Sequence, residues 1–327
     1  MASVDVVVPC YQYGHFLRDA VSSVLAQDLP DLRVLIIDNA STDNSVEVAQ
    51  QLAAEDQRVE AVGHAINKGA TYSYNEGIDW ARADYFLLID ADDLLAPHAL
   101  SRAVAVMEEN PEISFTHGVE ARLMPDGSMG PRGLNWGSTE WTVSSGRDFI
   151  ERLCRMPVNN VGANTVVRRT SAQKRVGYYN RSLPYSDDLE MWLRLATAGS
   201  VASTRSVQAV RRHHDSRMSS AYDGVGLRDF TEREAAFVSF LSRYGQHPGN
   251  APQLLRAARR GLGQHAYWSA VSHLVRGQGR AAARLVGYAI GNCPSAAVLP
   301  PLGWVFRMDR PLARIGEIAS DVLLRRG

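Results

Sequence analysis

The 327-residue chain has few cysteines and no long apolar run. Its three cysteines, Cys10, Cys154 and Cys293, are far apart and lack the spacing of a disulfide framework or a metal site, which favours a reducing compartment. No stretch approaches the roughly 20 apolar residues of a membrane span. No basic leader precedes the first apolar run at Val4, so we expect no signal peptide and a cytoplasmic protein.

Net charge is also absent, but the charges are unevenly distributed. The formal charge of the chain is zero, whereas the segment from Arg256 to the end holds 11 arginines, no lysine and three acidic residues, which makes it +8 and the remainder −8. Such asymmetry predicts contact with an anionic surface, such as a membrane met peripherally from its inner side. The alternative is a solvated helical face.

Alternating strand and helix patterns fill the first 120 residues. Helix-spaced apolar residues separate short apolar runs, which predict strands. These runs lie at residues 4–8, 32–38, 58–62, 85–89 and 113–118. The alternation predicts βαβ units and a mostly parallel sheet flanked by helices. Further strands are predicted at 162–168 and 202–210, and only helices from 227 onward. We therefore predict one domain over 1–225, divided near residue 120, and a helical region over 226–327.

Carboxylates gather where the fourth predicted strand ends. Asp90, Asp92 and Asp93 lie within four residues directly after a buried apolar run. The carboxyl ends of strands in an open α/β sheet line the ligand crevice. Carboxylates this close repel one another unless a cation or hydrogen-bond donors compensate, and oxygen ligands suit Mg²⁺ or Mn²⁺. The alternative is an acidic turn that caps the next helix.

Other strand ends carry residues suited to a nucleotide. Asp38 can accept hydrogen bonds from a base or ribose, and Lys68 can meet a phosphate as a point charge. Neither Gly-x-Gly-x-x-Gly after the first strand nor Gly-x4-Gly-Lys-Ser/Thr occurs, which argues against a Rossmann dehydrogenase or a P-loop enzyme. The pattern predicts a nucleotide-diphosphate site without a glycine-rich phosphate loop.

Five motifs resemble family 2 glycosyltransferases in their order and spacing. They are VVVPCY at 6–11, IIDNASTD at 36–43, NKG at 67–69, NEG at 75–77 and LIDADD at 88–93. The resemblance covers about residues 3–220 and implies the GT-A fold and an inverting reaction. It implies Asp92 as a metal ligand and a set of nucleotide-sugar contacts. These contacts are Pro9, Tyr11, Asp38, Asn67, Lys68, Asp90 and Ala91.

The second half resembles the same family at two further places. The segment SDDLEMW at 186–192 resembles the family's paired-acid motif, which implies Asp188 as the catalytic base, with Glu190 as the competitor. Helix-start acids that interact with the helix dipole are the alternative. The segment RRHHDSRMS at 211–219 resembles the Arg-x-His motif. It implies His213 as a metal ligand or phosphate contact, with His214 facing elsewhere; a structural histidine is the alternative.

One position departs from the family pattern, since Tyr74 stands where an arginine is usual. The resemblance implies a metal-dependent glycosyltransferase that uses Mn²⁺ or Mg²⁺. It moves a sugar from a nucleotide-diphosphate sugar, with a UDP-sugar favoured, to a hydroxyl acceptor in cell-envelope glycan or glycoconjugate synthesis. Residues 1–120 would bind the donor, and 121–225 would carry the acceptor site and base. The alternatives are a nucleotidyltransferase of similar fold and a non-catalytic nucleotide-sugar-binding module. We expect no nucleic-acid partner.

Overall fold

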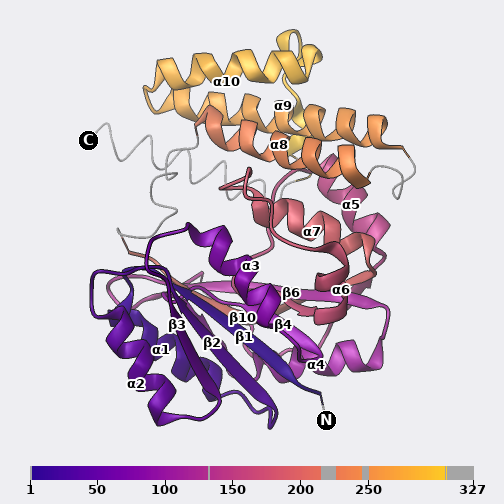
Figure 1. The fold of residues 1–327 in the computed structure, drawn as a ribbon. Helices are drawn as coiled ribbons and strands as arrows, with labels where there is room; N and C mark the ends of the chain where they lie inside the picture. The colour runs from indigo at the N-terminus through magenta and orange to yellow at the C-terminus, as the bar shows by residue number, and fades with distance from the viewer. Residues whose placement is uncertain (1, 132, 215–225, 245–249, 306, 308–327) are drawn as a thin grey trace. The chain divides into compact units, whose positions relative to one another are not determined.

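The computed structural model describes residues 2–131, 133–214, 226–244, 250–305 and 307 (Figure 1). The chain divides into two compact units, one of residues 1–149 and 160–217 and the other of 150–159 and 218–327. The domain boundaries near residues 120 and 225 stay predictions. Part of the basic C-terminal segment and the end of the segment at 211–219 lie outside the described residues.

The first unit alternates strands and helices along its N-terminal half. The elements of this half are β1 (Val4–Cys10), α1 (Gly14–Leu25), β2 (Leu32–Asp38), α2 (Ser45–Glu55), β3 (Val59–Gly63), α3 (Ala70–Trp80), β4 (Tyr85–Leu88), β5 (Leu94–Leu95), α4 (Ala99–Glu109) and β6 (Ile113–Leu123). The elements that follow are β7 (Met129–Gly130), β8 (Thr142–Ser144), α5 (Gly146–Arg155), the 3₁₀ turn η1 (Ala163–Thr165), β9 (Val167–Arg169), α6 (Thr170–Val176), α7 (Asp187–Thr197) and β10 (Ser200–Arg212). The residues of α5 from Ile150 onward belong to the second unit.

A single sheet organises this unit in the order β3-β2-β1-β4-β9-β6-β10-β5, with β7 and β8 attached at its side. Strands β1 to β4 are parallel, and β6 is parallel to β10. Strand β9 runs antiparallel between β4 and β6. The predicted mostly parallel sheet flanked by helices is therefore confirmed. The reversed strands are β9 at its centre and the short strands β5, β7 and β8, which pair antiparallel with β6 or β10.

Both faces of the sheet are covered, which explains why its strands are continuous apolar runs. Val6 and Val8 of β1 belong to a buried cluster with residues of α1, α2 and α4. Val7 points to the other face, because side chains alternate along a strand. There it lies against α3, where a Cβ added to Gly77 would come within 2.6 Å of Val7 Cγ1.

Two predicted strands differ from the observed ones. The strand predicted at 113–118 continues to Leu123, because Gly118 does not end it. A Cβ at Gly118 would lie 2.9 Å from the Ser206 carbonyl oxygen, so the glycine permits close approach to β10. The strand predicted at 162–168 is instead a 3₁₀ turn followed by β9, since the Gly162 carbonyl accepts hydrogen bonds from both the amide and the hydroxyl of Thr165.

The second unit is helical in its described residues. Its elements are α8 (Leu227–Tyr244), α9 (Ala251–Val275), α10 (Gly279–Asn292), the 3₁₀ turn η3 (Pro294–Ala297) and α11 (Leu302–Val305). Asn250 caps α9, with its side chain accepting from the Gln253 amide. Phe230, Leu262 and Leu285 are fully buried among these helices. None of the described helices has the length and apolar character needed to cross a membrane.

Candidate active site

The predicted strand-end residues meet at the carboxyl edge of the sheet. Cys10 of β1, Asp38 of β2 and Gly63 of β3 lie side by side in register. The Ile89 amide extends the pairing of β4 by donating to the Val7 carbonyl, and Asp90 follows. The parallel register therefore brings residues far apart in sequence to one edge.

Asp38 offers an unsatisfied acceptor at this edge. Its side chain is only 2% exposed, and Oδ2 accepts a hydrogen bond of 2.9 Å from the Ser41 amide. Oδ1 is buried and has no hydrogen-bond partner among the described residues. A buried carboxylate oxygen without a donor is costly, so this atom is suited to a ligand that brings one.

A hydrogen-bond network organises the loop that carries Asn67 and Lys68. Asn39 Oδ1 accepts from the Lys68 amide at 2.9 Å, while its Nδ2 donates to Asn67 Oδ1 at 3.0 Å. The His64 ring bridges Asn39 Oδ1 and Glu76 Oε2 at 2.9 and 2.5 Å. The network thus ties the NKG motif to the NEG motif of α3.

The remaining predicted nucleotide contacts lie at the same edge. Pro9 is half-buried in β1, Tyr11 follows that strand with 45% of its surface exposed, and Ala91 is fully buried beside Asp90. The Lys68 ammonium lies 4.3 Å from the centre of the Tyr72 ring. The contact of Lys68 in this structure is therefore with an aromatic face.

The acidic cluster is crowded. Asp90, Asp92 and Asp93 each have a carboxylate oxygen within 4.8 Å of the others. Desolvation by the surrounding protein and repulsion from Asp92 raise the pKa of Asp90 to about 7. Burial, followed by repulsion from Asp92 and Asp90, raises the pKa of Asp93 well above its usual range. Charge of this density and an oxygen-rich donor set fit a divalent cation.

Asp93 is engaged by protein donors on both of its oxygens. Oδ2 accepts from Asn164 Nδ2 at 2.7 Å, and Oδ1 accepts from the Arg212 amide at 3.1 Å. Asp93 does not cap the next helix, as the acidic-turn alternative proposed, because α4 begins at Ala99 with His98 at the N-cap. The carboxylate instead joins the acidic loop to η1 and to the end of β10.

A histidine from the end of β10 reaches the cluster, and it is His214. Its Nε2 lies 3.0 Å from Asp92 Oδ2, and its ring packs against Tyr13 and Phe16 at centroid distances of 5.5 and 4.9 Å. The prediction that His214 faces elsewhere is therefore wrong. The backbone amide of His213 continues the pairing with β6 by donating to the Leu123 carbonyl, and its role as a metal ligand stays a prediction.

Arg211 supplies positive charge near the same acids. Its Nη1 lies 3.6 Å from Glu120 Oε1. Burial alone would lower the pKa of Arg211, but the carboxylates of Glu120, Asp93 and Asp90 together raise it. Neighbouring carboxylates therefore compensate the charge of Arg211.

The paired acids at 187–188 open helix α7. Burial and repulsion from Asp188 raise the pKa of Asp187 to about 7, and Thr71 of α3 donates to Asp187 Oδ2 at 3.3 Å. Asp188 is half-buried, and its Oδ1 accepts from the Leu189 amide at 2.5 Å. The competing acid, Glu190, is fully buried and lies 2.8 Å from Arg194 Nε, which makes it a structural ion pair.

Tyr74 lies between the two acid groups. Its hydroxyl is 3.5 Å from Asp90 Oδ1. Burial, then the charges of Asp90, Asp187, Tyr179 and Asp188, raise the pKa of Tyr74 well above its usual range. The phenol therefore stays neutral where the family usually has a cation, and its ring lies 5.5 Å from the ring of Tyr179.

Comparison with known proteins identifies the family. The model of glycosyl transferase family 2 matches residues 5–175, which contain β1 to β4 and the acidic cluster. The chain belongs to this family. The expected enzyme class, a glycosyltransferase, is thereby confirmed.

Relatives in this family align over part of the chain. An uncharacterized glycosyltransferase of Haemophilus influenzae is 24% identical over 224 residues, which is 67% of this chain and 68% of that protein. The chondroitin synthase of Pasteurella multocida is 29% identical over 133 residues, covering 41% of this chain but 14% of that protein. The chain thus spans a small part of this synthase.

Solved structures confirm the GT-A fold. The mannosyltransferase PcManGT from Pyrobaculum calidifontis, in complex with GDP-Man and Mn²⁺, aligns with a TM-score of 0.60 at 18% identity, covering 98% of this chain and 85% of that one. Residues 1–349 of S. aureus TarS, in complex with UDP-GlcNAc, align with a TM-score of 0.55 at 15% identity, covering 94% of each chain. Identities this low support the fold alone.

Several residues at this edge were not predicted from the sequence. They are His64, Thr71, Asn164 and His214, together with the role of Glu76 in the network. Only His214 had a local signal, because it adjoins the predicted His213. The others become visible when distant elements meet.

Proposed function

We propose that this glycosyltransferase transfers a sugar from a UDP-sugar to a hydroxyl acceptor, with inversion and with the help of a divalent cation. The single observation that carries the choice of uridine is the buried Oδ1 of Asp38, which lacks a protein donor. The other oxygen already accepts from the Ser41 amide. Only one oxygen therefore remains free, which suits the single N3–H of uracil. Guanine presents two adjacent N–H donors and suits a carboxylate with both oxygens free.

For the cation, Asp92 with Asp90 supplies carboxylate oxygens, and the loop after β10 supplies an imidazole. Sequence spacing favours His213, whereas the 3.0 Å approach of Nε2 to Asp92 favours His214. Mn²⁺ and Mg²⁺ both suit this donor set. When bound, the cation would neutralise the departing diphosphate. Comparing His213→Ala with His214→Ala for Mn²⁺ affinity distinguishes the two histidines.

For the base, we propose Asp188. An inverting displacement needs a carboxylate that removes the proton from the acceptor hydroxyl as the new bond forms. Burial and the adjacent Asp188 raise the pKa of Asp187 to about 7, and its side chain is only 9% exposed. Asp188 is half-buried and therefore more accessible to an acceptor hydroxyl. Glu190 is a weaker candidate, since its carboxylate is fully buried against Arg194. Tyr74 separates this pair from Asp90 without adding charge.

A donor panel tests the proposal. The protein with Mn²⁺ is incubated with UDP-, GDP- and TDP-sugars, and release of nucleotide diphosphate and thermal stabilisation are measured. We expect release and stabilisation with a UDP-sugar. Preference for GDP-sugars would refute the role assigned to Asp38, and no release with any donor would favour the non-catalytic binding module. The nucleotidyltransferase alternative loses its support with membership of this family.

The donor panel also prepares tests of the biological context, the acceptor and the stereochemistry of the reaction. Cell-envelope glycan or glycoconjugate synthesis remains the proposed context, and a cytoplasmic location remains a prediction from the sequence. Once the donor sugar is fixed, acceptors that carry free hydroxyls can be screened by transfer of the labelled sugar. The anomeric configuration of the product, read by NMR, tests inversion directly.

A further inference from the structure

The second unit contains a long segment with no acidic residue. Residues 235–308 hold eight arginines and neither aspartate, glutamate nor lysine. Glu234, directly before this region, lies 2.8 Å from Arg259 Nε. Within the described residues, no carboxylate forms an ion pair with Arg256, Arg260 or Arg284.

One side of the α9–α10 hairpin carries exposed aliphatic side chains. On α10, Tyr288 faces α8, since its hydroxyl lies 2.8 Å from Glu234 Oε2. Val286 and Ile290 are each two positions from Tyr288 and therefore point to roughly the opposite side of a helix with about 100° per residue. They are 39% and 38% exposed.

Leu274 of α9 lies on the same side of the hairpin. The His265 ring of α9 packs against Phe230 of α8 at 5.2 Å. Leu274 is nine positions further on, about two and a half turns, so it points away from α8. It is 65% exposed, and Val271 in the preceding turn is 37% exposed. The side of the hairpin away from α8 is therefore apolar and uncovered by the described residues.

Two unpaired arginines continue this side along α9. Arg256 precedes Leu274 by 18 positions, about five turns, and Arg260 precedes Val271 by 11, about three turns. Both arginines are exposed. We call the side formed by Val271, Leu274, Val286 and Ile290 with Arg256 and Arg260 the basic–apolar face. It extends about 27 Å along α9 at 1.5 Å per residue.

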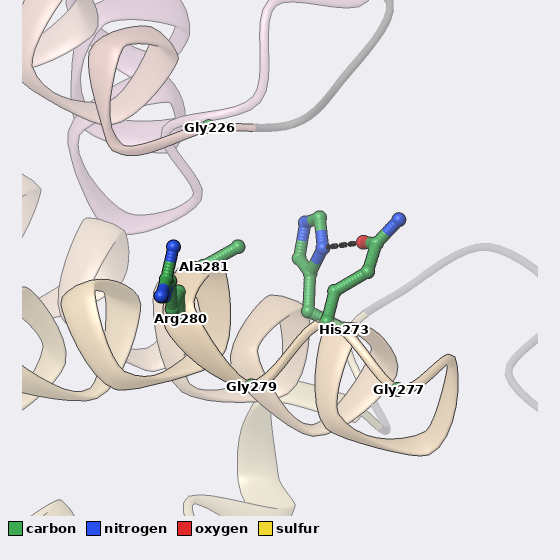
Figure 2. A pocket seen from close by; sticks show the side chains of 7 residues that line it. Gly226, His273, Gly277, Gly279, Arg280 and Ala281 are labelled. Atoms are coloured by element: carbon green, nitrogen blue, oxygen red, sulfur yellow. Dashed lines mark hydrogen bonds between the residues drawn. The ribbon is translucent and has the colours of Figure 1, made fainter.

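The turn of the hairpin adds further basic groups. A hollow of about 620 Å³ opens there, and His273, Gln278 and Arg280 are among its lining residues (Figure 2). His273 contacts the Gln278 side chain, and the described residues that line the hollow include no carboxylate. The charge at the tip of the hairpin thus has the same sign as that of the face.

We propose that the basic–apolar face binds the surface of an anionic lipid membrane. Exposed arginines complement phosphate headgroups, and the aliphatic side chains beside them suit the boundary between headgroups and acyl chains. A nucleic acid would use the arginines but not the aliphatic residues. Peripheral attachment of this kind needs no spanning helix, and it would hold the enzyme beside lipid-borne substrates.

The test is vesicle sedimentation with the full chain. Vesicles contain phosphatidylcholine alone or with roughly one-third phosphatidylglycerol, so that the anionic potential is the variable. We expect sedimentation with the anionic vesicles at low salt and weaker sedimentation at high salt. Arg256→Ser with Arg260→Ser should weaken binding about 30-fold, taking about 1 kcal/mol for each arginine and 1.4 kcal/mol for each factor of ten. Leu274→Gln should weaken the binding that persists at high salt.

A charge-matched control is Arg82→Ser with Arg205→Ser, two exposed arginines of the first unit; it should bind vesicles as the unchanged protein does. Donor hydrolysis, measured in parallel, reports whether each variant is folded and tests the proposed function separately. Absence of vesicle binding, equal binding to neutral vesicles, or equal binding by the Arg256/Arg260 variant would overturn the proposal. A dimer that Leu274→Gln dissociates, without vesicle binding, would assign the face to a second copy.

Discussion

Replacing Asp38 by asparagine isolates the proposed uracil contact. The change keeps the shape of the side chain, and the amide oxygen can still accept from the Ser41 amide, as Oδ2 does at 2.9 Å. The amide nitrogen then occupies the position of the unpaired Oδ1. Because the side chain is 2% exposed, it has little freedom to turn. A donor would therefore face the N3–H of uracil in place of an acceptor.

The expected loss of UDP affinity equals the contribution of one hydrogen bond to a charged group. Such a bond contributes about 1.5–3 kcal/mol, so the Kd for UDP should rise roughly ten- to 150-fold at 1.4 kcal/mol per factor of ten. Isothermal titration calorimetry with UDP and Mn²⁺ measures it. Asp84→Asn is the matched control: Asp84 lies before β4, at the opposite edge of the sheet, and accepts from the Ser3 amide. An unchanged Kd for Asp38→Asn would refute the assignment of Asp38 to the base.

Four further substitutions probe the acids and the packing of the sheet, and a fifth, at Gly287, is a control. Asp92→Asn should abolish the Mn²⁺ dependence of UDP binding; calorimetry that still shows this dependence would remove Asp92 from the cation site. Asp188→Asn should leave UDP affinity unchanged and lower kcat by about 10²–10⁴-fold, and near-normal turnover would disprove its role as base. Asp187→Asn should raise the free energy of unfolding above pH 7 by up to about 4 kcal/mol, because the pKa rises from 3.8 to about 7 at 1.36 kcal/mol per unit. The gain should vanish in urea titrations as the pH falls toward 4, and a gain independent of pH would contradict this cause. Gly77→Ala, whose Cβ would meet a β1 side chain at 2.6 Å, should lower the free energy of unfolding by about 1–2 kcal/mol in the same titrations. Gly287→Ala, in open space on α10, should instead raise the free energy of unfolding by up to about 1 kcal/mol.

The strand ends could be predicted because their signal is local. β2 begins at Leu32 and ends at Asp38, as predicted. A strand buried on both faces is an apolar run, and its end is marked by the first polar residue. Once the strands are known to be parallel, their carboxyl ends must meet at one edge. Asp38 and Asp90 therefore came to the same edge without any knowledge of side-chain contacts.

The residues that were missed depend on contacts between distant segments. β9 exists because it pairs with β4 and β6, and no local pattern distinguishes its short run from a turn. Asn164 acquires a role only when η1 meets Asp93. The two histidines show the limit most directly, because neighbours on an extended chain point to opposite sides. A shift of one residue exchanges the imidazole that faces Asp92.

The acids of the site form two groups. In each group a raised carboxylate pKa opposes folding at neutral pH, but a different interaction offsets it. Desolvation and a neighbouring carboxylate raise the pKa values of the exposed Asp90 and the buried Asp187 to about 7. Groups that oppose folding are expected at functional sites, where other parts of the structure compensate. A divalent cation held by Asp90 and Asp92 would relieve the repulsion at Asp90 and would stabilise the folded state by RT ln(1 + [L]/Kd). At Asp187 the offset comes from the protein itself, because the Asp188 amide and the Thr71 hydroxyl each donate to one of its two oxygens and lower the pKa that burial raises.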